Sequence, residues 1–298
     1  MIVGFIGLGT MGAPMARNIL DKGHQLIVAD IRPAAVSSLV VAGATAASTA
    51  AEAAARSEIV ITMLPDAPDV ERVALAPGGI VDGIKSGAVY IDMSTIDPET
   101  TRKVGAAITR KGAFMIDSPV GKTADAAVAG TLTLMVGGPA EIIARCRAVL
   151  DCMGTDFFHC GELGAGQTMK LINNLLATAI AEASTEALVT GARSGLMLDT
   201  MMSVFRTTMA WNNALAISMP KRPLVGDFAP GFMLKLAHKD CRLALKMVDA
   251  LGITAPVGHA ALASLDEGMR RGLADQDVGA LLKLREEPAG VKVRLAKR

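Results

Sequence analysis

The sequence predicts an α/β fold in two parts, a doubly wound parallel sheet followed by an all-helical domain. Up to Gly161, short apolar runs alternate with helix-like segments, which is the pattern of βαβ units that build a parallel sheet. After Gly161 the strand-like runs stop and only helix-like segments follow. We therefore expect one domain over residues 1–162 and a second over residues 163–298, joined by a long helix.

The strand-like runs are short, mostly apolar and ended by Gly, Pro, Asp or Ser. They cover residues 2–8, 25–30, 59–64, 88–93, 113–117 and 131–137. Helix-like segments lie between the earlier runs, over 11–22, 33–42, 49–56 and 98–111. The run at 131–137 follows a loop, so it could be antiparallel to the others.

A helix-like stretch of about 28 residues opens the second half and ends at Gly195. Glycine often follows the last helical residue because it adopts the left-handed conformation without strain. The stretch is apolar around most of its circumference, which predicts that it is buried. Further helices are expected over 198–208, 232–251, 258–270 and 277–286.

The composition is that of a soluble globular protein. The chain has 298 residues, of which 51% are hydrophobic, and a net charge of +1, so it can form two domains with separate cores. The balanced charge and the aromatic content of 3% argue against nucleic-acid binding, which needs a clustered basic face or stacking side chains. The basic tail at 290–298 is expected to be a solvated chain end.

Neither a signal peptide nor a membrane-spanning run is predicted, because the apolar start is short and runs directly into glycines. The four cysteines form no C-x-x-C pair and no cluster with zinc spacing. We expect reduced structural thiols, a cytoplasmic location and no metal site.

The first helix-like segment opens on a glycine pattern typical of dinucleotide-binding turns. The pattern follows an apolar strand, and Asp30 ends the next strand 18 positions after Gly12. Gly7 would allow the tight turn, Gly9 the approach of the backbone to a pyrophosphate, and Gly12 the packing of helix on strand. The residues expected to contact the cofactor here are Gly7, Gly9, Thr10, Met11 and Gly12.

Asp30 bears on which dinucleotide is bound. Its carboxylate could accept hydrogen bonds from both ribose hydroxyls and would repel a 2′-phosphate, which favours NAD over NADP. Arg32 lies two positions later and could meet a 2′-phosphate, but a solvated position for its side chain is favoured. We expect NAD, with NADH as the reduced form, and NADP as the less favoured alternative.

Lys170 and Asn174 are the polar residues of the long helix that point to chemistry. They lie four positions apart and so share one face of an otherwise apolar helix. Beside a carbonyl, Lys170 could donate a proton to the oxygen as hydride reaches the carbon, and burial would lower its pKa toward the working pH. Asn174 could orient the lysine and the substrate. Equally, Lys170 could extend its charged end to the surface.

Several motifs in order along the chain resemble those of the β-hydroxyacid dehydrogenases, the group of 3-hydroxyisobutyrate dehydrogenase and tartronate semialdehyde reductase. The resemblance covers nearly the whole length of the chain. The motifs are GFIGLGTMGAPMARNI near the start, MLP at 63–65, IDMSTIDP at 91–98, DSPV at 117–120, GTLTLMVGG at 130–138, GAGQTMKLINN at 164–174 and F...LAHKD at 232–240.

The resemblance implies a Rossmann domain, a helical domain that forms the interface of a homodimer or homotetramer, and NAD(P)-linked interconversion of an alcohol and an aldehyde. It makes Lys170 the general acid/base and Asn174 its partner in positioning the substrate, and it places Ser94 beside the substrate. Cofactor contacts are implied for Met63, Leu64, Pro65, Thr95 and Lys239.

The chain departs from the family pattern after Val120. Most members have Ser-Gly-Gly there, which binds the substrate carboxylate, whereas this chain has Gly121, Lys122 and Thr123. A cation and an added hydroxyl suit an anion that has more acceptor oxygens than a carboxylate, such as a sulfonate or phosphate. The variant resembles the sulfolactaldehyde reductase branch, which has an arginine where Lys122 stands. The alternative is that Lys122 points into solvent.

We therefore expect NADH-dependent reduction of a small anionic aldehyde, 3-sulfolactaldehyde, to 2,3-dihydroxypropane-1-sulfonate. Two alternatives stay open. One is reduction of a carboxylate semialdehyde, such as succinic, tartronate or methylmalonate semialdehyde. The other is a catalytically silent NAD-binding protein, against which the presence of Lys170 argues.

Overall fold

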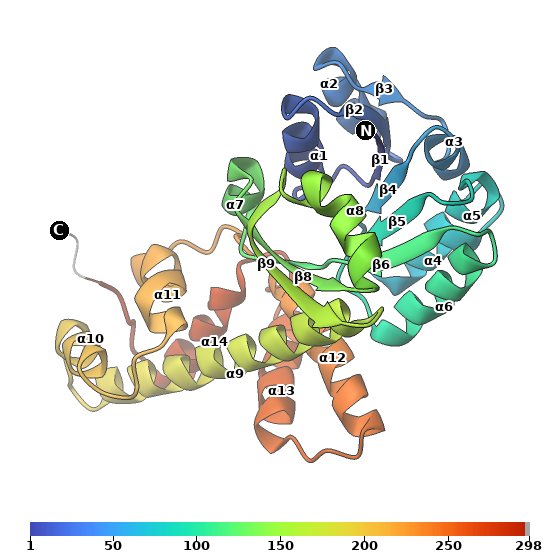
Figure 1. The fold of residues 1–298 in the computed structure, drawn as a ribbon. Helices are drawn as coiled ribbons and strands as arrows, with labels where there is room; N and C mark the ends of the chain where they lie inside the picture. The colour runs from blue at the N-terminus through green and yellow to red at the C-terminus, as the bar shows by residue number, and fades with distance from the viewer. Residues whose placement is uncertain (296–298) are drawn as a thin grey trace. The chain divides into compact units, whose positions relative to one another are not determined.

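A computed structural model describes residues 1–295 of the chain (Figure 1). The backbone divides into two compact units, the first over Met1–Lys170 and the second beginning at Leu171. The division falls within a long helix, α9 (Ala165–Arg193), whereas the boundary expected from the sequence follows residue 162. The sheet with its helices in the first unit, and the helices of the second, confirm the predicted fold class.

The first unit is built around one sheet. Its strands are β1 (Ile2–Ile6), β2 (Gln25–Ala29), β3 (Thr45–Ala46), β4 (Ile59–Thr62), β5 (Val89–Asp92), β6 (Phe114–Asp117), β7 (Val120–Gly121), β8 (Leu132–Gly137) and β9 (Gly154–Gly161). They lie in the order β3-β2-β1-β4-β5-β6-β8-β7, with β9 beside β8. Strands β1 to β6 are parallel, and the chain reverses its direction across the sheet between β1 and β4. Ligands of doubly wound sheets bind at such a reversal, beyond the carboxyl ends of the strands.

Helices cover both faces of this sheet (Figure 1). They are α1 (Gly12–Asp21), α2 (Pro33–Val41), α3 (Ala50–Ala55), α4 (Ala67–Leu75), α5 (Ile80–Gly83), α6 (Pro98–Thr109), α7 (Ala124–Ala129) and α8 (Ala140–Leu150). Neighbouring residues of a strand point to opposite faces, so Ile61 joins one core and Val60 the other. The parallel strands are therefore apolar along their length because both of their faces are buried.

The strands and helices predicted for the first unit are confirmed, with ends that differ by at most two residues. Strand β8 pairs antiparallel with β6, through Asp117 and Gly137. The sequence analysis missed the two-residue strands β3 and β7 and the longer strand β9. Most side chains of β9 are partly or fully exposed, so no continuous apolar run marks this edge strand in the sequence.

The second unit continues from α9 as a set of helices. They are α10 (Leu198–Arg206), a π-helical turn (Ala214–Ser218), α11 (Met219–Lys221), a 3-10 turn (Pro223–Val225), α12 (Leu234–Ala250), α13 (Pro256–Arg270), a 3-10 turn (Val278–Ala280) and α14 (Leu281–Ala289). One part of the core gathers around Leu188 and Leu215, and another around Leu234 and Leu265.

The tail was predicted to be solvated, and this is wrong for its described part. Val293 is 1% exposed within the core of the second unit, and Arg294 pairs with the Glu286 carboxylate. The rest of the tail, residues 296–298, lies outside the described residues. Between residues 1 and 295, no helix has the length and apolar character to cross a membrane. The same residues contain no group of three or more His, Cys, Asp or Glu side chains that could hold a metal ion.

Candidate active site

The turn between β1 and α1 has the geometry that a dinucleotide requires. Gly7 has a φ of +94°, and a Cβ there would lie 2.4 Å from a backbone carbonyl oxygen. A Cβ on Gly12 would lie 1.9 Å from the Gly7 carbonyl oxygen, so only glycine lets the helix approach the strand. Nothing lies within 4 Å of a Cβ added to Gly9, while Thr10 is exposed and Met11 half-buried. A pyrophosphate fits beside this open backbone at the helix N-terminus.

Asp30 closes the turn from the end of β2. Its carboxylate accepts the Leu8 amide at 2.6 Å and the Arg32 amide at 2.8 Å. The Arg32 guanidinium pairs with the same carboxylate, Nε to Oδ1 at 3.1 Å, and donates to the Leu8 carbonyl oxygen at 2.9 Å. Partial burial raises the pKa of Asp30, but these hydrogen bonds outweigh burial and hold the pKa below its usual value. Arg32 is therefore bound to Asp30, while its side chain is 58% exposed, as the predicted solvated position requires.

The loops after β4 and β5 are joined through Ser94. Met63, Leu64 and Pro65 follow β4, and Ser94 and Thr95 follow β5. The Leu64 amide donates to the Ser94 hydroxyl oxygen at 2.9 Å. Ser94 is fully buried, so its hydroxyl connects the two loops. Its contact with a substrate stays a prediction.

Two buried side chains that the sequence analysis did not single out connect these loops and β6 to helix α9. The Gln167 side chain accepts the Ile96 amide at 3.1 Å and donates to the Ser94 carbonyl oxygen at 2.8 Å. Asp117, the last residue of β6, accepts the amides of Gly164 and Gln167 at 2.6 and 2.7 Å. Both side chains are fully buried.

Lys170 lies on α9 one turn beyond Gln167 and is only 9% exposed. This burial argues against the alternative in which the lysine extends its charged end into solvent. Burying an ammonium is costly without polar partners or a function. The position of Lys170, on a helix tied to the strand-end loops, favours the predicted general acid/base.

The predicted anion loop connects β7 to α7 through Gly121, Lys122 and Thr123. Lys122 has a φ of +75°, a conformation that residues other than glycine rarely adopt. Its ammonium donates to the Asp156 carboxylate of β9 and to the Thr131 carbonyl oxygen, each at 2.6 Å. The Thr123 hydroxyl makes no capping hydrogen bond to α7. The charge of Lys122 is thus directed at Asp156, and its contact with a substrate stays a prediction.

In the second unit, Asp240 joins two residues that were predicted for the site. Its Oδ2 accepts the Asn174 side-chain amide at 2.6 Å, and its Oδ1 lies 3.3 Å from the Lys239 ammonium. Asp240 is 3% exposed. One buried carboxylate therefore holds both Asn174 and Lys239. In the sequence, the only indication of this role was that Asp240 follows Lys239 in the LAHKD motif.

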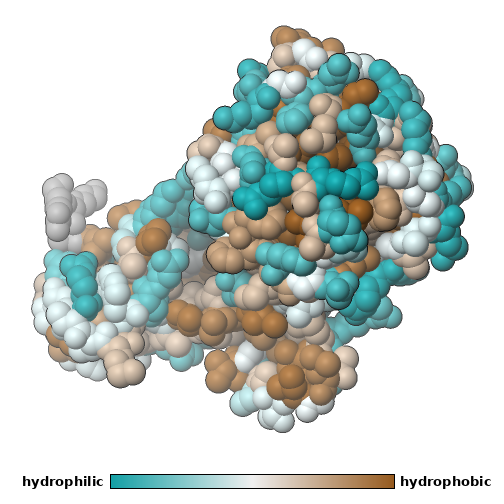
Figure 2. Space-filling view, in the orientation of Figure 1, coloured by the Kyte–Doolittle hydropathy of each residue, from teal (hydrophilic) through white to brown (hydrophobic). Residues whose placement is uncertain are grey.

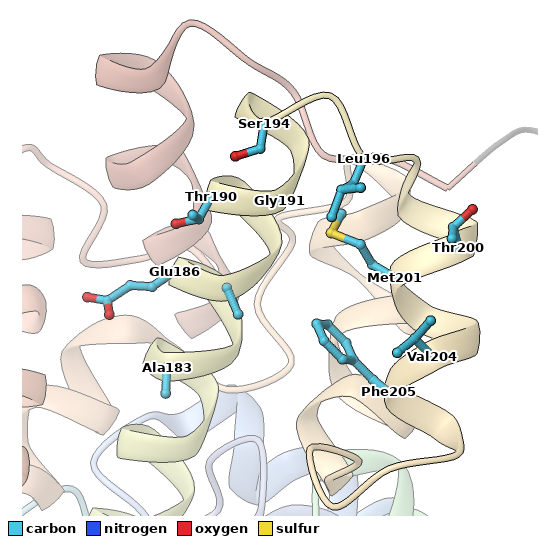
Figure 3. Close-up of a pocket in the computed structure, with 11 residues that line it drawn as sticks. Ala183, Glu186, Thr190, Gly191, Ser194, Leu196, Thr200, Met201, Val204 and Phe205 are labelled. Atoms are coloured by element: carbon cyan, nitrogen blue, oxygen red, sulfur yellow. The ribbon is translucent and has the colours of Figure 1, made fainter.

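A cavity of about 630 Å³ lies in the second unit, between α9 and α10 (Figure 3). The side chains of Leu196, Met201, Val204 and Phe205 make it largely apolar, and Figure 3 shows Phe205 on the α10 side facing α9. Within the described part of the chain, none of the residues predicted for the site lines this cavity.

Apolar side chains also gather along the visible face of α9 (Figure 2). On this helix, Ile172 and Leu176 are 47% and 60% exposed. The prediction that this helix is buried around its circumference is therefore wrong for the single chain.

Comparisons with known proteins match both units. The family model described as the NAD binding domain of 6-phosphogluconate dehydrogenase matches residues 2–161. The model described as NAD-binding of NADP-dependent 3-hydroxyisobutyrate dehydrogenase matches residues 164–285. The two matches together span the sheet and the helices.

Two curated relatives and one solved structure agree with these models. The chain is 39% identical over 293 residues to a 3-sulfolactaldehyde reductase of Escherichia coli, covering 98% of each chain. It is 40% identical over 262 residues to a 3-hydroxyisobutyrate dehydrogenase of Pseudomonas aeruginosa, covering 86% of this chain and 88% of the relative. The Mycobacterium tuberculosis 3-hydroxyisobutyrate dehydrogenase solved with L-serine has a TM-score of 0.89 at 33% identity, covering 95% of this chain and 98% of its own. The chain therefore belongs to the β-hydroxyacid dehydrogenase family, as an NAD(P)-binding oxidoreductase that acts on CH–OH groups.

Proposed function

We propose that the protein is an NADH-dependent reductase of a small anionic aldehyde, and that it converts 3-sulfolactaldehyde to 2,3-dihydroxypropane-1-sulfonate. The observation that carries the proposal is the buried Lys170, which lies at the start of α9 where that helix is hydrogen-bonded to the loops at the strand ends. The similarity to a relative named 3-sulfolactaldehyde reductase supports the choice of substrate.

The reaction is a hydride transfer coupled to protonation. When bound, the reduced nicotinamide supplies the hydride to the aldehyde carbon. Lys170 donates a proton from its ammonium to the carbonyl oxygen, so that the C=O group becomes CH–OH, and the neutral lysine regains a proton from water. One aldehyde, one NADH and one proton thus give one alcohol and one NAD⁺. Asn174 would orient the substrate, with its own amide fixed by Asp240.

The substrate sulfonate would bind at the turn of Gly121, Lys122 and Thr123. In this proposal a sulfonate oxygen replaces Asp156 as the partner of the Lys122 ammonium. The exchange costs little, because the two side chains are 42% and 49% exposed and exposed ion pairs contribute little to stability. The Thr123 hydroxyl supplies a further donor.

The preference for NADH rests on Asp30, whose carboxylate stays ionised at neutral pH and would repel a 2′-phosphate. We further propose a cytoplasmic homodimer or homotetramer. The exposed apolar residues Ile172 and Leu176 on α9 support self-association of the chain.

A carboxylate semialdehyde is the second candidate substrate. If Lys122 remains paired with Asp156, the turn offers backbone amides and the Thr123 hydroxyl but no charge, which suits a carboxylate. The relative in Pseudomonas aeruginosa, named a 3-hydroxyisobutyrate dehydrogenase, supports this candidate.

Oxidation of NADH with a matched panel of aldehydes tests the proposal. The panel pairs 3-sulfolactaldehyde with succinic, tartronate and methylmalonate semialdehydes. We expect the sulfonate to have the highest kcat/KM, by about 10-fold or more, as one added charge contact would give. A wide preference for a carboxylate would overturn the sulfonate proposal. Binding of NADH without turnover of any aldehyde would favour the silent NAD-binding protein.

A further inference from the structure

Two buried side chains hold the start of helix α9 against the sheet. One extends from the sheet to the helix, and the other extends from the helix to a loop at the end of a strand. Asp117 reaches from the sheet to the helix, and its two oxygens accept the amides of Gly164 and Gln167 at 2.6 and 2.7 Å. Gln167 reaches from the helix to the loop after β5, where it accepts the Ile96 amide and donates to the Ser94 carbonyl oxygen. Each side chain thus uses both of its polar atoms in bridging the sheet and the helix.

The space around Asp117 fits its carboxylate closely. A Cβ on Gly137 would lie 2.5 Å from Oδ1, and a Cβ on Gly166 would lie 2.7 Å from Oδ2 and 2.2 Å from the Met135 carbonyl oxygen. Glycine at both positions therefore lets the carboxylate lie between β8 and the helix. The first turn of a helix has unpaired amides and a partial positive charge, both of which an anion satisfies.

These contacts continue to the loop that is predicted to bind the cofactor. The Leu64 amide donates to the Ser94 hydroxyl oxygen, and the carbonyl oxygen of Ser94 accepts from Gln167. Lys170 follows Gln167 by one turn, so both residues share a face of α9 and both are buried. Hydrogen bonds through Ser94 thus connect the MLP loop to Gln167, which lies one helical turn before Lys170.

We propose that Asp117 and Gln167 are positioning residues that set the place of Lys170 relative to the loops after β4 and β5, which are predicted to contact the cofactor. They do not touch the reacting atoms. They fix the depth and rotation of the first turns of α9, and misplacing a catalytic group by about 1 Å costs on the order of 100-fold in rate. This inference rests on the proposed function of Lys170 as the general acid.

The test compares Gln167→Met, Gln167→Glu and Asp117→Asn in the full chain. Methionine matches the length of glutamine but makes neither hydrogen bond, and glutamate keeps only the acceptor for the Ile96 amide. We expect Gln167→Met to lower kcat about 10- to 100-fold, with the aldehyde KM and the Kd of NADH within about 3-fold of wild type. Gln167→Glu should not recover kcat, because its second carboxylate oxygen faces the Ser94 carbonyl oxygen and cannot donate to it. The alkaline limb of the kcat–pH profile should also move, because a general acid must be protonated and Lys170 changes its surroundings.

A matched control is Glu286→Gln. Glu286 is also a buried carboxylate that accepts a backbone amide, that of Val293 at 2.6 Å, but it lies in the second unit at the end of α14. This variant should lower the melting temperature while kcat and the pH profile stay unchanged. If Gln167→Met and Asp117→Asn also melt lower but retain kcat and the pH profile, the two residues are only structural and the proposal is overturned.

A readout without turnover separates this proposal from the proposed function. Lysines carrying ¹³C-methyl groups are titrated by NMR, and Lys170→Arg assigns the Lys170 resonance. If the wild-type protein reduces none of the aldehydes, the proposed function is wrong, and this result alone does not decide the positioning proposal. A changed Lys170 titration in Gln167→Met, with an unchanged one in Glu286→Gln, still supports positioning. An unchanged titration in both overturns it.

Discussion

Asp30 is a residue at which one side chain stabilises the fold and is also proposed to select the cofactor. It accepts the Leu8 amide of the dinucleotide turn and at the same time holds the Arg32 guanidinium. Removal of its charge would therefore act on two groups at once. It would end the repulsion of a 2′-phosphate and release a cation that can bind one.

Asp30→Asn tests this dual role, because asparagine keeps an acceptor for the Leu8 amide. We expect the kcat/KM ratio of NADPH to NADH to rise by about 10-fold or more, as the gain of one charge contact implies. Steady-state kinetics with both cofactors measures the ratio. Asp21→Asn, which breaks an exposed ion pair with Arg17 on α1, is the matched control and should leave the ratio unchanged. An unchanged ratio in Asp30→Asn as well would remove Asp30 from cofactor selection.

Lys122 combines a left-handed backbone with a charge, and two substitutions separate these properties. Lys122→Gly removes the charge and suits the φ of +75°, whereas Lys122→Ala removes the charge and keeps the unfavourable backbone. If the ammonium binds the substrate sulfonate, both variants should raise the KM for 3-sulfolactaldehyde by about 10-fold or more. The KM for a carboxylate semialdehyde should change little.

Asp156→Asn should change the KM for the sulfonate in the opposite direction. It removes the carboxylate that holds the Lys122 ammonium, so the KM for the sulfonate should fall. Equal losses for sulfonate and carboxylate aldehydes in all three variants would mean that the ion pair only shapes the loop. Aldehyde kinetics across the three variants decides between these outcomes.

At the scale of elements, the strands β1, β2, β4, β5, β6 and β8 could be predicted because strands that are buried on both faces of a sheet have continuous apolar runs. Strand β9 could not, because it lies beside β8 at the margin of the sheet and exposes residues such as Asp156. The first turn of α9 shows a different limit. Its hydrogen bonds join residues 47 to 73 positions apart, so their partners are set by the fold and no local spacing reveals them.

The anchoring of α9 by Asp117 predicts an unusual dependence of stability on pH. Burial, followed by the charge of Asp92 on the neighbouring strand, raises the pKa of Asp117 to about 7 despite its amide hydrogen bonds. The charge of Asp117 in turn adds to the effect of burial in raising the pKa of the Cys160 thiol. A carboxyl group with a raised pKa binds its proton more tightly in the folded state. Its contribution to stability is therefore complete below about pH 4 and is lost as the pH rises through about 7.

Chemical denaturation of wild type and Asp117→Asn at several pH values measures this contribution. Asparagine cannot ionise, so the free energy of unfolding of wild type relative to the variant should fall between about pH 4 and pH 7 and then stay constant. A fall on the order of 4 kcal/mol corresponds to the pKa difference at 1.36 kcal/mol per unit. A difference that stays flat over this range would show that Asp117 is ionised throughout.

At the scale of the whole molecule, the division into a sheet unit and a helical unit could be predicted from the change in pattern after Gly161. The residues expected to bind the dinucleotide fall in the first unit, with the exception of Lys239. Asn174 lies on α9 one turn beyond Lys170, but across the division between the units. The sequence therefore predicts functional residues in each unit, while Asp117, which holds the first turn of α9, and Asp240, which holds Asn174, follow from the structure.

Binding of the cofactor and turnover are separable properties of the whole chain, and Lys170→Met separates them. Methionine fills a similar volume without a proton to donate, so kcat should fall by about 10²- to 10⁴-fold, the usual contribution of a general acid or base. NADH should still bind at the glycine turn and stabilise the folded chain, by about 2.7 kcal/mol at a concentration 100 times the Kd. Stopped-flow oxidation of NADH measures the first effect, and the shift in melting temperature on adding NADH measures the second. If the variant kept its turnover, Lys170 would not be the general acid. If it lost NADH binding together with turnover, the lysine would serve the cofactor site instead of the chemical step.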